Sequence, residues 1–222
     1  MESYRSEEEQ VEALKRWWKE NGRSTMLGIA LALGLGFGWQ AWQKNQELAA
    51  QNASNLYQQM LQALSAEEDQ TTTIGRQIAQ ELKDNHRGTV YAQFAALHLA
   101  RLAVNDGQPQ AAEQELRWAL AMADGNADIQ QVAQLRLARI LASLDKHDEA
   151  LGLLEGANSD FAASYAIARG DILLSQGMEA EAFAAYESAM EAMDASAPIP
   201  QTLQDKLEYL GARLQSAVAE AS

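Results

Sequence analysis

Three histidines are the residues of this sequence most suited to metal binding or acid–base chemistry. They are His86, His98 and His147, and no two stand at the H-x-x-x-H spacing of a helical zinc site. The sequence has no cysteine and no glycine-rich phosphate loop or G-x-S-x-G motif. It therefore predicts no catalytic site, metal or cofactor. We expect ordinary packing or surface roles for the histidines, and an exported enzyme is the least favoured of three functional hypotheses.

Arginine and apolar side chains at helical spacing favour a protein-binding surface instead. In an array of stacked helical hairpins, the first helix of each hairpin lines the concave face. The candidate binding residues on that face are Phe94, Leu97, Arg101, Val104, Val132, Leu135, Arg139, Ile167, Asp171 and Leu174. Such a groove would suit a partner helix or an extended, partly unfolded segment. The alternative is that several of these residues only pack against the preceding helix.

Internal similarity predicts the hairpins themselves. Residues 99–120, 137–158 and 169–190 align in one register, and the shared alanines at their centres lie 38 and 32 residues apart. These distances bracket the period of about 34 residues that is typical of tetratricopeptide repeats. With abundant Ala, Leu and Gln, the pattern predicts an all-α fold, a tetratricopeptide-like helical-repeat solenoid. Chance similarity between alanine-rich helices is the alternative.

Small residues fit this interpretation at defined places. Ala100 and Gly170 stand where two antiparallel helices must approach closely, and Gly107 and Gly177 fall in the turns between helices, where a left-handed backbone is often needed. The middle unit has Asp145 at the turn position instead of glycine.

Helices outside the three units are expected to close the two ends of the array. Residues 54–64 and 72–83 could form a divergent leading hairpin. Residues 201–219 carry leucines at helical spacing from Leu203 to Leu214, which suits a terminal helix that covers the open end of a solenoid.

One segment, residues 25–42, is suited to lipid. It carries no charge, and as a helix it would span about 27 Å at ~1.5 Å per residue, close to the ~30 Å of a bilayer core. Lys and Arg lie mostly before it, so residues 1–24 are predicted to stay in the cytoplasm and residues 43–222 to be exported. The alternative is a cleaved signal peptide, which the long, acidic N-terminal region and the missing A-x-A site disfavour.

A stripe of small residues lies within this segment. Ala30, Gly34 and Gly38 recur every four positions, so another transmembrane helix could approach them closely. The alternative is that glycine is simply frequent in transmembrane helices. Ahead of the membrane, apolar residues at helical spacing predict a short amphipathic helix from about Glu7 to Glu20, with Asn21-Gly22 as its stop.

The charge of the chain bounds its partners. The formal net charge is −14, and nearly all of the acidic excess follows residue 42. Nucleic acid is therefore not an expected partner, because binding it requires clustered Lys and Arg. The acidity instead suits solubility or repulsion of anionic lipid.

The start of the chain has a specific pattern. The run EQVEALKRWW (9–18), then ENG (20–22), a Gly-rich anchor that ends in Gly38-Trp39 and a tetratricopeptide-like tail resemble the YfgM family over essentially the whole chain. The resemblance implies a single-pass protein of the bacterial inner membrane with a periplasmic domain, an ancillary subunit of the SecYEG translocon. Implied partners are that translocon and a membrane-anchored periplasmic chaperone of the PpiD type. Unfolded exported chains are further candidates, and the resemblance implies no catalytic residues.

Two protein-binding functions follow. The preferred hypothesis is a non-enzymatic, membrane-anchored adaptor that links chains leaving the translocon to periplasmic chaperones, where tethering compensates for weak affinity. The alternative is an envelope scaffold or stress-signalling regulator that acts through protein–protein contacts, for example those of residues 1–24.

Overall fold

The computed structural model describes residues 7–66, 69–123, 125–193 and 198–220. These residues form helices and contain no strand, which confirms the expected all-α fold. The helices are α1 (Glu7–Ser65), α2 (Asp69–Asn85), α3 (Val90–Asn105), α4 (Pro109–Met122), α5 (Ala127–Ser143), α6 (His147–Leu153), α7 (Ser159–Ser175), α8 (Glu179–Glu191) and α9 (Gln201–Glu220). The chain divides into two compact units, an N-terminal unit up to Asn52 and a repeat unit from Ala53 onward.

The described part of the N-terminal unit, from Glu7 onward, is one unbroken helix, so the predicted helix stop at Asn21-Gly22 is wrong. Glycine inside a helix costs only about 1 kcal/mol relative to alanine, too little to end a long helix. Asn21 also fits the helix, because its side-chain amide donates to the Trp17 carbonyl at 3.2 Å. The hydroxyls of Ser24 and Thr25 in turn donate to the Asn21 carbonyl, each at 2.9 Å.

Helix α1 is long and apolar enough to cross a membrane. It contains an 18-residue window with a mean hydropathy of 1.2, none of which is buried. Within the predicted span, Leu31, Leu35 and Phe37 are 61%, 70% and 68% exposed. Soluble monomers rarely expose contiguous apolar surface on this scale, so the segment is suited to burial in a membrane or against a partner.

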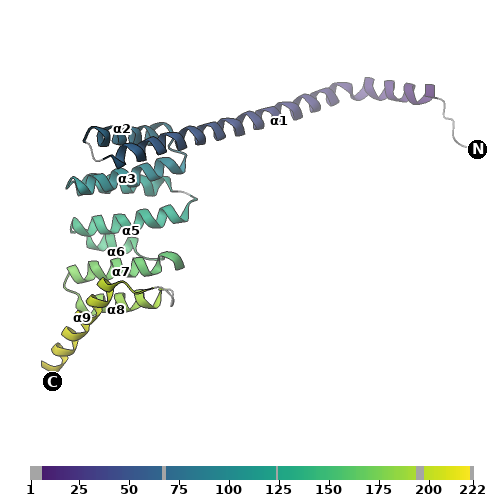
Figure 1. The fold of residues 1–222 in the computed structure, drawn as a ribbon. Helices are drawn as coiled ribbons and strands as arrows, with labels where there is room; N and C mark the ends of the chain where they lie inside the picture. The colour runs from purple at the N-terminus through teal and green to yellow at the C-terminus, as the bar shows by residue number, and fades with distance from the viewer. Residues whose placement is uncertain (1–6, 67–68, 124, 194–197, 221–222) are drawn as a thin grey trace, which may run out of the picture. The chain divides into compact units, whose positions relative to one another are not determined.

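Three helical hairpins form the centre of the repeat unit, as the internal similarity predicts. They are α3–α4, α5–α6 and α7–α8, and they stack in chain order (Figure 1). Each turn contains one residue with a left-handed backbone: Gly107 at φ 69°, Asp145 at φ 60° and Gly177 at φ 77°. Asp145 replaces glycine in the middle turn because the short polar side chain of aspartate tolerates this conformation better than most side chains do.

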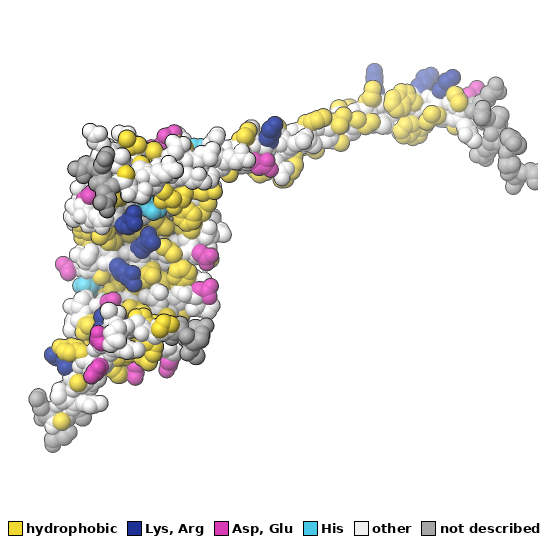
Figure 2. Space-filling model, in the orientation of Figure 1, with side chains coloured by type: hydrophobic (Ala, Val, Ile, Leu, Met, Phe, Trp, Pro, Cys, Tyr) yellow, Lys and Arg dark blue, Asp and Glu magenta, His cyan; other side chains and the backbone are white. Residues whose placement is uncertain are grey.

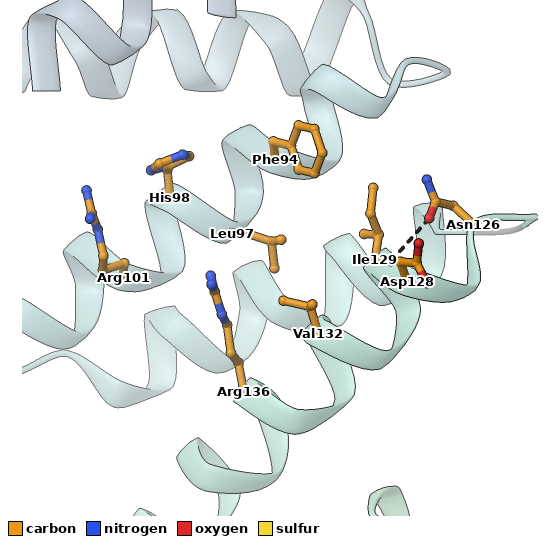
Figure 3. A pocket seen from close by; sticks show the side chains of 9 residues that line it. All are labelled: Phe94, Leu97, His98, Arg101, Asn126, Asp128, Ile129, Val132 and Arg136. Atoms are coloured by element: carbon orange, nitrogen blue, oxygen red, sulfur yellow. Dashed lines mark hydrogen bonds between the residues drawn. The ribbon is translucent and has the colours of Figure 1, made fainter. Parts of the chain in front are cut away.

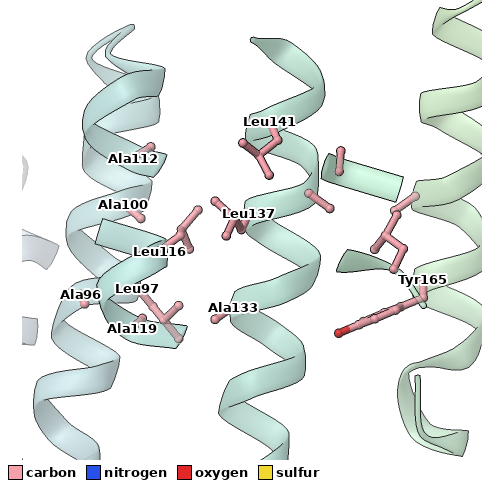
Figure 4. Close-up of a cluster of buried hydrophobic side chains, with 14 of the residues drawn as sticks. Ala96, Leu97, Ala100, Ala112, Leu116, Ala119, Ala133, Leu137, Leu141 and Tyr165 are labelled. Atoms are coloured by element: carbon pink, nitrogen blue, oxygen red, sulfur yellow. The ribbon is translucent and has the colours of Figure 1, made fainter. Parts of the chain in front are cut away.

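Alanine dominates the core between these hairpins (Figure 4). The alanines at positions 96, 112, 119 and 133 are fully buried, and so are Leu137 and Leu141. Interaxial distance depends on the side chains at the contact, so alanine at these positions lets helices pack closely while leucine fills the remaining space. Tyr165 completes this cluster from α7, where its hydroxyl donates to the Gln131 carbonyl at 3.0 Å.

Gly170 and Tyr186 make the closest helix contact of the last hairpin. A Cβ atom added to Gly170 would lie 2.6 Å from Cδ1 of Tyr186, a separation that real side chains do not adopt. Tyr186 is fully buried, and its hydroxyl donates to Asp171 at 2.7 Å. Glycine at position 170 is therefore a packing requirement, in agreement with the sequence analysis.

Both ends of the array are closed as expected. The last turns of α1 pack with α2 and α3 through Ala53, Met60 and Leu82, so the leading hairpin predicted from residues 54–64 and 72–83 is confirmed. At the other end, Leu203 and Leu210 of α9 are buried in the cluster that also holds α7 and α8.

Candidate functional site: an arginine groove between α3 and α5

A hollow of about 400 Å³ lies between the first helices of two successive hairpins. We call it the arginine groove. It is lined by Phe94, Leu97, His98, Arg101, Asn126, Asp128, Ile129, Val132 and Arg136 (Figure 3). Helix α3 contributes the first four residues and α5 most of the others, so two helices of the array build one surface.

The structure brings together four of the candidate binding residues. Phe94, Leu97, Arg101 and Val132 all line the arginine groove. Leu97 is only 7% exposed because it also belongs to the core, so it forms the floor of the hollow.

The other candidates on the repeats lie outside the groove. Val104 is 48% exposed on α3, and Leu135 packs against the core of the hairpins. Ile167 and Leu174 pack against the C-terminal core cluster. Asp171 accepts hydrogen bonds from Tyr186 and Lys206, so its carboxylate serves the packing of α7, α8 and α9. Arg139 is exposed on α5, close enough to Arg136 to influence it.

The sequence analysis missed the other five lining residues, His98, Asn126, Asp128, Ile129 and Arg136. Of these, His98 and Arg136 bear most on the charge of the groove. The helical period could have found them: His98 lies four positions after Phe94, and Arg136 four after Val132, each on the same face of its helix. His98 therefore faces a candidate binding surface, whereas the sequence analysis gave it only an ordinary packing or surface role.

Arg101 and Arg136 of the groove, and the neighbouring Arg139, have no carboxylate partner among the described residues. Among the ion pairs of the described residues, none involves Arg101, Arg136 or Arg139. Desolvation, and then the positive charges of Arg101 and Arg139, lower the pKa of Arg136. Figure 2 shows dark blue side chains gathered on one face of the repeats, beside yellow apolar ones. The groove therefore concentrates positive charge that no ion pair of the described residues neutralises.

His98 is held in place by the end of α1. The Tyr57 hydroxyl and Nε2 of His98 are 3.2 Å apart, and the Tyr57 ring also stacks near Phe94 at a centroid distance of 5.8 Å. Burial, and then the charges of Arg101 and Arg136, hold the pKa of His98 below its usual value. The positive charge of the groove comes from Arg101 and Arg136.

The opposite end of the groove is chemically different. Asn126 caps α5, where its side-chain oxygen accepts the Ile129 amide at 3.2 Å, and Asp128 lies in the first turn. Figure 3 shows Asn126 and Asp128 at one end and Arg101 with His98 at the other, with apolar side chains between them. Such an arrangement can distinguish the two ends of a bound segment.

Elsewhere on the repeats, charged side chains form ion pairs in a hydrogen-bonded cluster around Glu113. Glu113 is 8% exposed and accepts hydrogen bonds from Lys146 and Arg117, both at 2.8 Å. These bonds lower the pKa of Glu113. Arg117 also donates to Glu149 at 2.6 Å, so the cluster joins two hairpins. The described residues contain no group of three His, Asp or Glu side chains that could hold a metal ion.

Comparison with known proteins fits this architecture. Residues 15–212 match the family described as "Tetratricopeptide repeat-like domain". A protein of Escherichia coli K12 named "Ancillary SecYEG translocon subunit" is 32% identical over 95% of this chain and 99% of its own length. The chain belongs to the YfgM family.

Other members of the YfgM family match over similar lengths and carry the same name. The protein from Aggregatibacter actinomycetemcomitans is 33% identical over 92% of this chain and 97% of its own length. The protein from Haemophilus influenzae is 31% identical over 83% of this chain and 89% of its own length. No solved structure matches the chain significantly.

Residues 30, 34 and 38 of the predicted membrane stripe are exposed on α1. A Cβ atom added to Gly34 or Gly38 would meet no atom within 4 Å. The surface is therefore smooth and uncovered, and its role in contacting another membrane helix stays a prediction.

Proposed function

We propose that this chain is a non-enzymatic adaptor of the inner membrane that works beside the Sec translocon. In this proposal α1 anchors the chain with residues 1–24 in the cytoplasm, and the repeat unit lies in the periplasm. The repeat unit then presents the arginine groove to segments of exported chains or of a periplasmic chaperone. Membrane tethering raises the local concentration of such partners, so each contact needs little affinity of its own.

The observation that carries the proposal is the arginine groove itself. It combines an apolar floor with arginines that make no ion pair with any residue that the structure describes. Arg117, by contrast, is paired with Glu113 and Glu149. The exposed apolar window of α1 supports the membrane part of the proposal. The names of the relatives support the translocon part.

Photocrosslinking in native membranes tests the groove. A benzophenone amino acid at Phe94 keeps an aromatic side chain in the groove, and the same probe at the exposed Gln114 on α4 is the control. The proposal expects adducts with exported chains or periplasmic chaperones from position 94 and few from position 114. Equal adducts from both positions, or none from position 94, would contradict it.

The absence of cysteine allows a clean test of topology. Single cysteines at Glu12 and Ser143 can be labelled in intact spheroplasts with a maleimide that does not cross membranes. The proposal expects labelling at position 143 only, and at position 12 only after the membrane is permeabilised. Labelling at position 12 in intact spheroplasts would reverse the topology.

A further inference from the structure

The groove has a charge that contrasts with the rest of the molecule. The whole chain carries a formal net charge of −14, and its carboxylates pair with cations elsewhere, as in Lys83–Glu115 and Arg213–Glu179. On α3 and α5, by contrast, Arg101, Arg136 and Arg139 lie near one another, and none of them has an ion pair among the residues that the structure describes. Like charges held together disfavour each other, so a bound anion would relieve a repulsion that the free protein contains.

Positive charge alone would attract any anion, but the groove also has an apolar part. Phe94, Leu97, Ile129 and Val132 lie between the Asp128 end and the Arg101 end (Figure 3). A simple phosphate ion would leave this apolar surface wet. A membrane surface is too flat to enter a hollow between two helices. A peptide segment can satisfy both parts at once, with an apolar side chain on the floor and a carboxylate among the arginines.

The helix geometry sets the spacing of the two features. Phe94 and Arg101 are seven residues apart on α3, and Ile129 and Arg136 are seven apart on α5. Seven residues of α-helix correspond to about 10 Å along the axis. An extended peptide rises ~3.3 Å per residue, so it covers that distance in about three residues. Asp128 repels a second carboxylate at the apolar end, which favours one direction of binding.

On the basis of the proposed adaptor function, we propose that the arginine groove recognises an extended peptide segment in which acidic side chains lie about three residues from an apolar one. The apolar side chain packs on Phe94, Leu97 and Val132. The carboxylate is held between Arg101 and Arg136, and Arg139 strengthens the local field. The groove therefore selects acidic–apolar segments of its partner proteins rather than unfolded chains in general.

Peptide binding to the full chain in phosphatidylcholine nanodiscs tests this selection. The probe is a fluorescein-labelled ten-residue peptide with two leucines followed, three positions on, by two glutamates in a serine–glycine background. Matched peptides carry glutamine or lysine instead of glutamate, or serine instead of leucine. Hydrogen bonds to charged groups predict that the glutamate peptide binds at least about tenfold more tightly than the glutamine and lysine peptides. Burial of the leucines predicts a similar advantage over the serine peptide. Equal binding of the glutamine peptide would overturn the proposal.

Variants assign the effect to the groove. The double substitution Arg101→Gln, Arg136→Gln should weaken binding of the glutamate peptide about tenfold. The control pair, Arg87→Gln with Arg213→Gln, removes the same charge from exposed positions outside the groove and should leave binding unchanged. Arg136→Glu should invert the preference, so that the lysine peptide binds better than the glutamate peptide. This gain of binding requires a folded protein, so misfolding cannot produce it, and failure to invert would contradict the proposal.

Competition separates a peptide from other anions. Unlabelled glutamate peptide should displace the probe, whereas millimolar phosphate should act no better than chloride at equal ionic strength. Equal displacement by phosphate or by phosphatidylglycerol vesicles would overturn the proposal in favour of an anion or a headgroup.

The failure of this inference can be told from the failure of the adaptor function. Adducts from position 94 that persist unchanged in the Arg101→Gln, Arg136→Gln protein would leave the adaptor standing and reject the charge recognition. Absence of adducts from position 94 in the unaltered protein would reject the adaptor itself.

Discussion

The membrane segment of α1 and the core of the repeats are both apolar, but only the apolar side chains of the repeats are buried within the protein. Large side chains such as Leu35 and Phe37 remain exposed on α1, whereas in the repeats small alanines let neighbouring helices cover one another. The first surface is suited to burial in lipid or against a partner, whereas the second is already packed within the repeats. An apolar substitution should therefore affect the folded stability of one region and not of the other.

Leu137→Ala should have the largest effect. Leu137 is fully buried in the repeat core, and truncating a buried leucine costs about 2–5 kcal/mol because a cavity remains. The free energy of unfolding can be measured by urea titration of the full chain in detergent, followed by circular dichroism. Leu33→Ala is the matched control, because Leu33 is 55% exposed on α1 and its loss should leave the unfolding of the repeats unchanged. Equal losses of unfolding free energy in the two variants would contradict the difference between the two regions.

Gly170→Ala should have the next largest effect on stability. The new Cβ would overlap the buried ring of Tyr186, and overpacking of this kind costs about 1–3 kcal/mol. Gly152→Ala in α6 is the control, because nothing lies within 4 Å of its added Cβ, and it should stabilise by up to about 1 kcal/mol through helix propensity. Thermal unfolding of the two variants should shift in opposite directions. A stable Gly170→Ala protein would refute the close approach of α7 and α8.

Glu113→Gln should cost about 1 kcal/mol at pH 7, because it removes the charged partner of Lys146 and Arg117. Those bonds lower the pKa of Glu113 in the folded state. Their contribution is therefore present above the unfolded pKa and is lost as the pH falls through the folded one. The unaltered and Glu113→Gln proteins should converge in stability at acidic pH, as urea titrations at several pH values can show. A constant difference would contradict the ion-pair account.

His98→Gln should produce the smallest effect, visible only in its pH dependence. The folded protein holds the pKa of His98 below the ordinary value of about 6.5. Between those two values the unfolded chain binds more protons, so folded stability falls as the pH is lowered below about 6.5. The His98→Gln protein lacks this component, so its stability should fall less between pH 7.5 and 5.5. A parallel pH dependence of the two proteins would show that the site around Tyr57 and the arginines leaves His98 unperturbed.

The same contrast explains what the sequence could predict. The hairpins were predictable because small residues and left-handed turns leave a local signal, as at Gly107 and Gly170. The helix stop at Asn21-Gly22 was predicted wrongly because a local stop signal competes with the cooperativity of a helix of 59 residues. The groove was predicted only in part: Phe94 and Arg101 follow from the repeat register. Helical spacing leads from Val132 to Arg136 on α5. How closely that face approaches α3 depends on how successive hairpins rotate against each other, and no local pattern records that rotation.

One measurement tests the account most directly: photocrosslinking from Gly34 in α1 and from Phe94 in the arginine groove, compared in the same native membranes. The account predicts two different sets of partners. Position 34 should yield adducts with membrane helices of the translocon or of a membrane-anchored chaperone. Position 94 should yield adducts with exported or periplasmic chains, and the amount of these adducts should decrease in the Arg101→Gln, Arg136→Gln protein. Only lipid adducts from position 34, together with no protein adducts from position 94, would contradict the central claim that one region anchors the chain and the other recognises its partners.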